Sequence, residues 1–147
     1  MTFESFVKAR LVSFVIEEAF TSGGVEPMLA VAQVIANRVH EGWQGGDWLK
    51  VIESAPDHRG TEQPRNYTPL DPRDGNIREL MRRIDEVYHG TADDSNVNIE
   101  DINNGKIRSL YYAELHNINR EWFTEHIAHD YLNHPRLAIV GQLTFFG

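Results

Sequence analysis

Apolar residues recur at steps of three and four in three stretches of the chain, and this spacing predicts three amphipathic helices. The first occupies roughly residues 1–20 and is closed by the glycines of "TSGG" (21–24), which suit a left-handed cap. The second starts near Pro27 and stops at "EGWQGGDW" (41–48). The third is "NIRELMRRIDEVYHG" (76–90), which ends at its own glycine.

The remaining segments predict a small β element among the helices. "SLYYAEL" (109–115) is typical of a short strand, and "RLAIVGQLTFF" (136–146) of one buried strand or an extended tail. The intervening stretches 53–76 and 91–105 are polar and rich in turn residues, and we expect loops there. The pattern as a whole predicts a mostly helical α+β fold. Two further short helices are expected at 48–52 and 119–134, and a small hairpin could form at "RNYT".

Glu17 and Glu18 end the apolar run of the first predicted helix, and helical geometry places them on different faces. Successive residues turn by about 100°. Glu18 therefore falls in line with Phe14 and Val15, whereas Glu17 falls on the polar side. A carboxyl group among apolar side chains loses water, which raises its pKa toward the range that a general acid needs near neutral pH. Glu18 is thus a candidate acid, although an exposed or ion-paired glutamate at a helix end fits the same pattern.

Composition and charge restrict the classes of function. The chain has 147 residues, which suits one domain over 1–147, and a net charge of −8, which disfavours nucleic-acid binding. It has no cysteine, so disulfides, zinc–thiolate sites and thiol nucleophiles are excluded. We see no membrane-spanning stretch and no signal-peptide pattern. We therefore expect synthesis in the cytoplasm, with action on any external target only after release or export.

Histidines near the C-terminus raise the possibility of a metal site. His126 and His129 lie three positions apart and are followed by Asp130, a spacing that lets a helix present both histidines to one ion. There is no HExxH motif, so a surface helix with polar histidines is the plainer interpretation. The sequence also lacks GxSxG, P-loop and GxGxxG motifs. No motif therefore indicates an enzyme of acyl or phosphoryl transfer.

Several blocks follow one another in the order of a known family. A Glu-Ala pair at 18–19 leads through a small loop into "AVAQVIANRV" (30–39). After it come Val51-Ile52, "QPRNYT" (63–68), a helix closed by glycine, "SLYYA" (109–113), Trp122 and "GQLTF" (141–145). This ordered set, over about residues 11–146, resembles the SleB-type cell-wall hydrolases, peptidoglycan-cleaving enzymes of the lysozyme-like superfamily. Leu143 stands where the family usually has a histidine, and the usual Arg-Gly after the Glu-Ala pair is missing, as in a divergent member.

The resemblance implies a single lysozyme-like domain, similar to lytic transglycosylases, that binds peptidoglycan glycan strands. It implies cleavage of the β-1,4 bond between N-acetylmuramic acid and N-acetylglucosamine, with Glu18 as the one general acid and base. Tyr67, Thr68 and Tyr112 are expected to line the sugar cleft, and Asn37 to bind sugar or to brace the neighbouring loop. No metal and no organic cofactor is needed for this chemistry.

Three alternatives remain open at this point. The reaction could be a hydrolysis that uses a second carboxylate. The chain could instead be a catalytically inactive lysozyme-like module with a binding or structural role, associated with a phage or with secretion. It could also be a metal-dependent hydrolase built on the histidine pair. The loop carboxylates available for a hydrolysis are those of Glu26, Glu62, Asp71 and Asp74.

Overall fold

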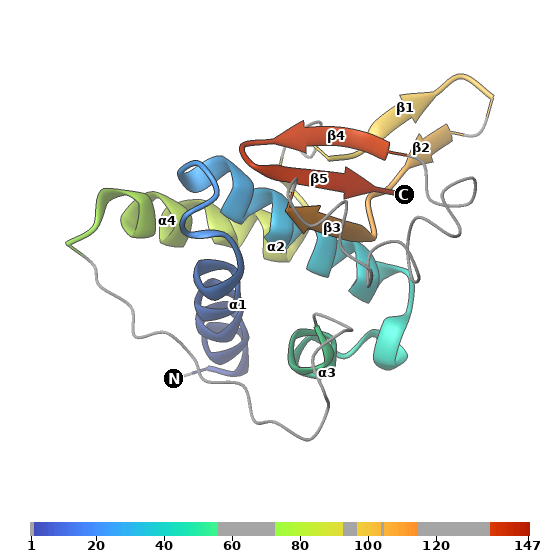
Figure 1. Cartoon of the computed structure of the whole chain (residues 1–147). Helices are drawn as coiled ribbons and strands as arrows, with labels where there is room; N and C mark the ends of the chain where they lie inside the picture. The colour runs from blue at the N-terminus through green and yellow to red at the C-terminus, as the bar shows by residue number, and fades with distance from the viewer. Residues whose placement is uncertain (1, 56–72, 93–96, 104, 115–135) are drawn as a thin grey trace.

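A computed structural model describes residues 2–55, 73–92, 97–103, 105–114 and 136–147 of the chain (Figure 1). Helices come first along this part of the chain and short strands follow, which confirms the mostly helical α+β class. The helices are α1 (Phe3–Ala19), α2 (Val25–His40), the 3-10 helix η1 (Trp43–Gly46), α3 (Trp48–Ser54) and α4 (Gly75–His89). The strands are β1 (Ile99–Asp101), β2 (Gly105–Ile107), β3 (Tyr111–Glu114), β4 (Arg136–Val140) and β5 (Leu143–Phe146).

Side-chain caps fix where three of the helices begin. Thr2, Asp47 and Asp74 accept hydrogen bonds from backbone N–H groups in the first turns of α1, α3 and α4, respectively. Such caps satisfy donors that have no partner within the helix, and each typically stabilises it by about 1 kcal/mol. At the other end of α4, Gly90 adopts the left-handed conformation with φ of 73°, as the sequence predicts.

Helix α1 is buried around most of its circumference in its middle turns, so the prediction of a single apolar face is wrong. Phe14 and Val15 are fully buried as predicted, but Ser13, one turn before Glu17 on the side predicted to be polar, is only 8% exposed. At the start of the helix, the apolar residue Phe3 is 67% exposed. The reason is that α1 contacts α2, α3 and α4. One hydrophobic cluster joins these four helices to β5.

The C-terminal segment forms a hairpin of β4 and β5 rather than the single strand or tail predicted from sequence. Strand β5 lies at the centre of a three-stranded antiparallel sheet in the order β3-β5-β4. All four residues of β5 are buried. Figure 1 shows this sheet lying against α2, with which β3 and β4 are in contact. The predicted loop 91–105 likewise contains β1 and leads directly into β2, and these two strands form a separate antiparallel pair.

The turn of the β4–β5 hairpin is held against the loop between α1 and α2. The N–H of Gln142 donates a hydrogen bond to the carbonyl of Ser22 over 2.8 Å. Gly141 has a φ of +58°, and a Cβ atom there would lie 2.2 Å from the Ser22 carbonyl oxygen. Only glycine allows this close approach. The contact brings the sheet to the C-terminal end of α1, where Glu18 lies.

In the part of the chain that the structure describes, no helix combines the length and the apolar character needed to cross a membrane.

Candidate active site

The candidate acid Glu18 and the candidate sugar-contacting residue Tyr112 are hydrogen-bonded to each other. Glu18 lies in the last turn of α1 and is half-buried. The phenolic hydroxyl of Tyr112, on β3, donates to Oε2 of Glu18 over 3.0 Å. The two residues are 94 positions apart in the sequence, so only the tertiary fold brings them together.

Pairing between β3 and β5 positions the ring of Tyr112. Tyr112 lies directly opposite Phe145 in the antiparallel register, and the two ring centroids are 6.2 Å apart. Phe145 is fully buried and belongs to the hydrophobic cluster, against which Tyr112 packs. Directly opposed residues share one face of a sheet. The ring of Tyr112 is therefore anchored on the core side of the sheet, and its hydroxyl reaches the end of α1.

Burial does not distinguish the two adjacent glutamates. Glu17 was expected on the solvated side of α1, but it is half-buried, as Glu18 is. What singles out Glu18 is the hydrogen bond from Tyr112. A hydroxyl that donates to one carboxylate oxygen fixes the orientation of the group, and proton exchange requires only the other oxygen. This arrangement suits an oriented acid or base.

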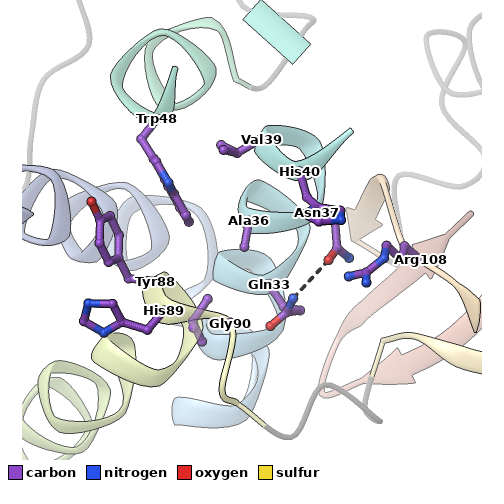
Figure 2. Close-up of a pocket in the computed structure, with 11 residues that line it drawn as sticks. Gln33, Ala36, Asn37, Val39, His40, Trp48, Tyr88, His89, Gly90 and Arg108 are labelled. Carbon is purple, nitrogen blue, oxygen red and sulfur yellow. Dashed lines mark hydrogen bonds between the residues drawn. The ribbon is translucent and has the colours of Figure 1, made fainter. Parts of the chain in front are cut away.

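Asn37 is buried and braces α2 against the segment before β3. Its amide nitrogen donates to Oδ1 of Asn98 and to the carbonyl of Ser109, each over 2.9 Å. Its oxygen accepts from Nε2 of Gln33 over 3.0 Å, as the dashed line in Figure 2 shows. A side-chain amide has two N–H donors, and both are used here. Of the two roles predicted for Asn37, the geometry fits bracing and leaves no donor for a sugar.

Further polar contacts fix the start of β3. The backbone N–H of Ser109 donates to Oδ1 of Asn98 over 2.8 Å, and the Ser109 hydroxyl donates to the carbonyl of Phe146 over 3.0 Å. Arg38, which is 4% exposed, donates from Nε to the carbonyl of Leu110 over 2.8 Å. Sequence reasoning missed Asn98 and Ser109 as members of a network. No local pattern links a helix residue to partners 61 and 72 positions away.

Aromatic rings cover the guanidinium of Arg38. It lies 4.6 Å from the ring centroid of Trp43 and 5.9 Å from that of Tyr111. Such cation–π contacts stabilise a guanidinium that burial has removed from water, in addition to its hydrogen bond to Leu110. Arg38 thus has a structural role, because it joins α2 to the residue before β3. Its contact with Tyr111, the neighbour of Tyr112, helps to hold β3 in place against α2.

Two of the four loop carboxylates considered for a hydrolytic mechanism have structural partners. Asp74 accepts hydrogen bonds from the N–H groups of Asn76 and Ile77 and caps α4. Glu26 forms an ion pair with Arg83 over 2.7 Å. The other two, Glu62 and Asp71, lie outside the described residues. So do the predicted helix at 119–134 and the "RNYT" hairpin, and with them Tyr67, Thr68, Trp122, His126, His129 and Asp130.

A cluster of charged side chains links α1 to α4. Ligand atoms of Glu4, Asp85 and His89 lie within 4.8 Å of one another. The ammonium of Lys8 lies 2.6 Å from Asp85, and their hydrogen bond raises the pKa of Lys8 and lowers the pKa of Asp85. His89 contacts both Glu4 and Asp85. Because Lys8 already supplies a positive charge here, the cluster is an ion-pair network rather than a metal centre.

No protein-family model, no curated protein and no solved structure matches the chain.

Proposed function

We propose that this protein is a peptidoglycan-cleaving enzyme of the lysozyme-like type, a lytic transglycosylase, in which Glu18 is the single general acid and base. The observation that carries the proposal is the 3.0 Å hydrogen bond from Tyr112 to Glu18. It joins the two described residues to which the sequence assigned the acid and a contact with the sugar. The half-buried position of Glu18 at the end of α1 is compatible with this role, but Glu17 is half-buried as well, so the hydrogen bond carries the assignment.

In the proposed reaction, protonated Glu18 donates its proton to the glycosidic oxygen between N-acetylmuramic acid and N-acetylglucosamine. The bond from C1 of the muramic acid to that oxygen breaks, and the leaving sugar departs with the proton. The Glu18 carboxylate then takes the proton of the muramic acid 6-hydroxyl, whose oxygen bonds to C1 and closes a 1,6-anhydro ring. Tyr112 keeps its donor on Oε2 throughout, because that oxygen accepts in both protonation states.

One carboxyl group is sufficient for this reaction because the nucleophile belongs to the substrate. Hydrolysis by the common schemes requires a pair of carboxylates about 5–9.5 Å apart. Asp74 and Glu26, the two described candidates for a partner, are engaged by a helix cap and an ion pair. As far as the described candidates are concerned, their engagement supports the transglycosylase reaction.

The alternative is a lysozyme-like module that has lost catalysis and retains a binding or structural role. Leu143 is the observation that favours it. The position where the family usually has a histidine is only 1% exposed here, within the hydrophobic cluster. The histidine that is usual at this position in the family is therefore replaced by a core residue of β5. The two proposals differ in their expected activity. The enzyme lyses peptidoglycan and needs the carboxyl group of Glu18 to do so, whereas the inactive module does not lyse it.

Zymography on purified peptidoglycan tests the proposal. Glu18→Gln keeps the size of the side chain and its ability to accept from Tyr112, but it cannot exchange the catalytic proton. We expect wild type to clear the gel and Glu18→Gln to lose activity roughly 10²–10⁴-fold, the usual contribution of a general acid. Glu17→Gln is the matched control, since it makes the same change one residue earlier on α1, and it should retain activity. Full lysis by Glu18→Gln would refute the assignment, and no lysis by wild type would favour the inactive module.

A further inference from the structure

A pocket of about 250 Å³ lies between the C-terminal half of α2, α3, the end of α4 and the residue that follows β2 (Figure 2). Neither Glu18 nor Tyr112 lines it. Ligand pockets for drug-sized molecules typically measure about 300–1,000 Å³. The pocket is therefore the right size for a single small ring and is distinct from the candidate active site.

Two unlike walls face each other across this pocket. One wall is aromatic, with Trp48 of α3 and Tyr88 of α4 at a centroid distance of 5.0 Å. The other is polar and presents Gln33 from α2 and Arg108 from the segment after β2. Figure 2 shows Ala36 between the two walls. Pockets of this kind bind a ring on the apolar side and fix its orientation through a few polar groups.

Arg108 supplies a charge that none of the described residues neutralises. It is half-buried, and among the described residues no hydrogen bond or ion pair reaches its guanidinium. The chain has a net charge of −8, with 22 acidic side chains against 14 basic ones, so carboxylates are the more numerous charged groups. A guanidinium presents N–H donors in a planar fork that matches a carboxylate. The polar wall therefore provides the recognition group for a carboxylate.

The opposite end of the pocket is occupied by a histidine that already has carboxylate partners. His89 lines that end, and its ring already contacts the carboxylates of Glu4 and Asp85. Figure 2 shows His89 on the Tyr88 side and Arg108 on the far side of Gln33. An anionic group is attracted to Arg108, whereas His89 already has carboxylate partners, and this difference orients the carboxylate of a ligand toward Arg108.

We propose that this pocket binds one acidic sugar ring, with the carboxylate at Arg108 and the ring against Trp48. A sugar fits better than an aromatic carboxylate because polar groups also flank the ring position. Gln33 uses one amide N–H for Asn37 and has a second N–H and its carbonyl oxygen for hydroxyl groups. The proposal does not depend on the assignment of Glu18.

The test uses two sugars that differ only in the carboxylate, methyl β-D-glucuronide and methyl β-D-glucoside. Binding is followed by NMR on the indole N–H of Trp48, which is assigned with Trp48→Phe. We expect the glucuronide to shift this signal and to bind at least roughly tenfold more tightly than the glucoside, as one charge-assisted hydrogen bond implies. Arg108→Gln should reduce glucuronide affinity to that of the glucoside, and Arg108→Lys should recover part of it.

Arg78→Gln is the matched control, because Arg78 is exposed at the start of α4 and its replacement changes the net charge equally. It should leave glucuronide affinity unchanged. Equal affinities for the two sugars would overturn the proposal, as would an unchanged glucuronide affinity in Arg108→Gln or the absence of any response at Trp48.

Discussion

Replacing Asn37 by alanine should destabilise the fold strongly, because Asn37 is a brace rather than a sugar ligand. The side chain is 1% exposed and donates two hydrogen bonds of 2.9 Å. Its loss removes both bonds, each with a net contribution of about 0.5–1.5 kcal/mol. It also leaves the buried Ser109 carbonyl without this donor, at a cost of about 1–3 kcal/mol. Oδ1 of Asn98 keeps its bond from the Ser109 N–H. The expected loss is about 2–6 kcal/mol.

The assay is urea unfolding followed by circular dichroism, with the free energy of unfolding extrapolated to water. A loss of this size is a large part of the about 5–15 kcal/mol typical of a natural domain. Asn37→Asp is a sharper test. It conserves size but places a carboxylate against two acceptor oxygens, and it should destabilise at least as much as alanine. Gln33→Ala is the control, because its bond to Asn37 is only partly buried and should be worth about 1 kcal/mol or less.

Two results would refute this reasoning. One is an Asn37→Ala protein within about 0.5 kcal/mol of wild type, the range expected for an unremarkable surface substitution. The other is an Asn37→Asp protein of unchanged stability. If sugar binding weakened while stability was unaffected, Asn37 would be a ligand-contacting residue after all.

Three further predictions concern the sheet. Tyr112→Phe keeps the ring on Phe145 but removes the donor to Glu18, so activity should fall roughly tenfold in zymography with the melting temperature nearly unchanged. Gly141→Ala should destabilise by at least about 1 kcal/mol more than Gly90→Ala in urea unfolding. Both glycines have positive φ, but only at 141 would the Cβ meet backbone, and equal losses would contradict the packing described. Thr144→Val should raise the melting temperature, by about 1 kcal/mol in stability, because the buried Thr144 hydroxyl lacks a partner in the described structure; a lower melting temperature would count against this.

Local sequence signals were sufficient to predict the helices. Periodicity located α1, α2 and α4, and the predicted glycine cap at Gly90 is present. Periodicity failed on α1, where Ser13 is buried, because helices on several sides of α1 cover its polar positions too. Which neighbours cover a helix is a property of the tertiary fold, and a single stretch of sequence does not contain it.

The β4–β5 hairpin was missed although a signal was present. The two residues between the strands, Gly141 and Gln142, form a two-residue loop that begins with glycine, which is a recognised hairpin pattern. The signal was not recognised because β5 is buried on both faces, so apolar and polar residues do not alternate along it. A continuous apolar run with an internal glycine can therefore be two strands joined by a tight turn.

The candidate site was predicted in part. The helical face argument selected Glu18, and the resemblance named both Glu18 and Tyr112, but neither predicted that they form a hydrogen bond. That contact depends on the pairing of β3 with β5 and on the seating of Gly141 against Ser22. Both are long-range features. The pocket at Arg108 had no sequence signal, because its walls come from four separate segments.

Mass analysis of the soluble products released from purified peptidoglycan tests the central claim most directly. The proposed reaction predicts muropeptides that end in 1,6-anhydro-N-acetylmuramic acid, lighter by one water than the hydrolysis products, from wild type and from Glu17→Gln. Glu18→Gln should release at least roughly 10²-fold less of them. Products with reducing ends would contradict the transglycosylase reaction, and anhydro products from Glu18→Gln at the level of wild type would contradict the role of Glu18.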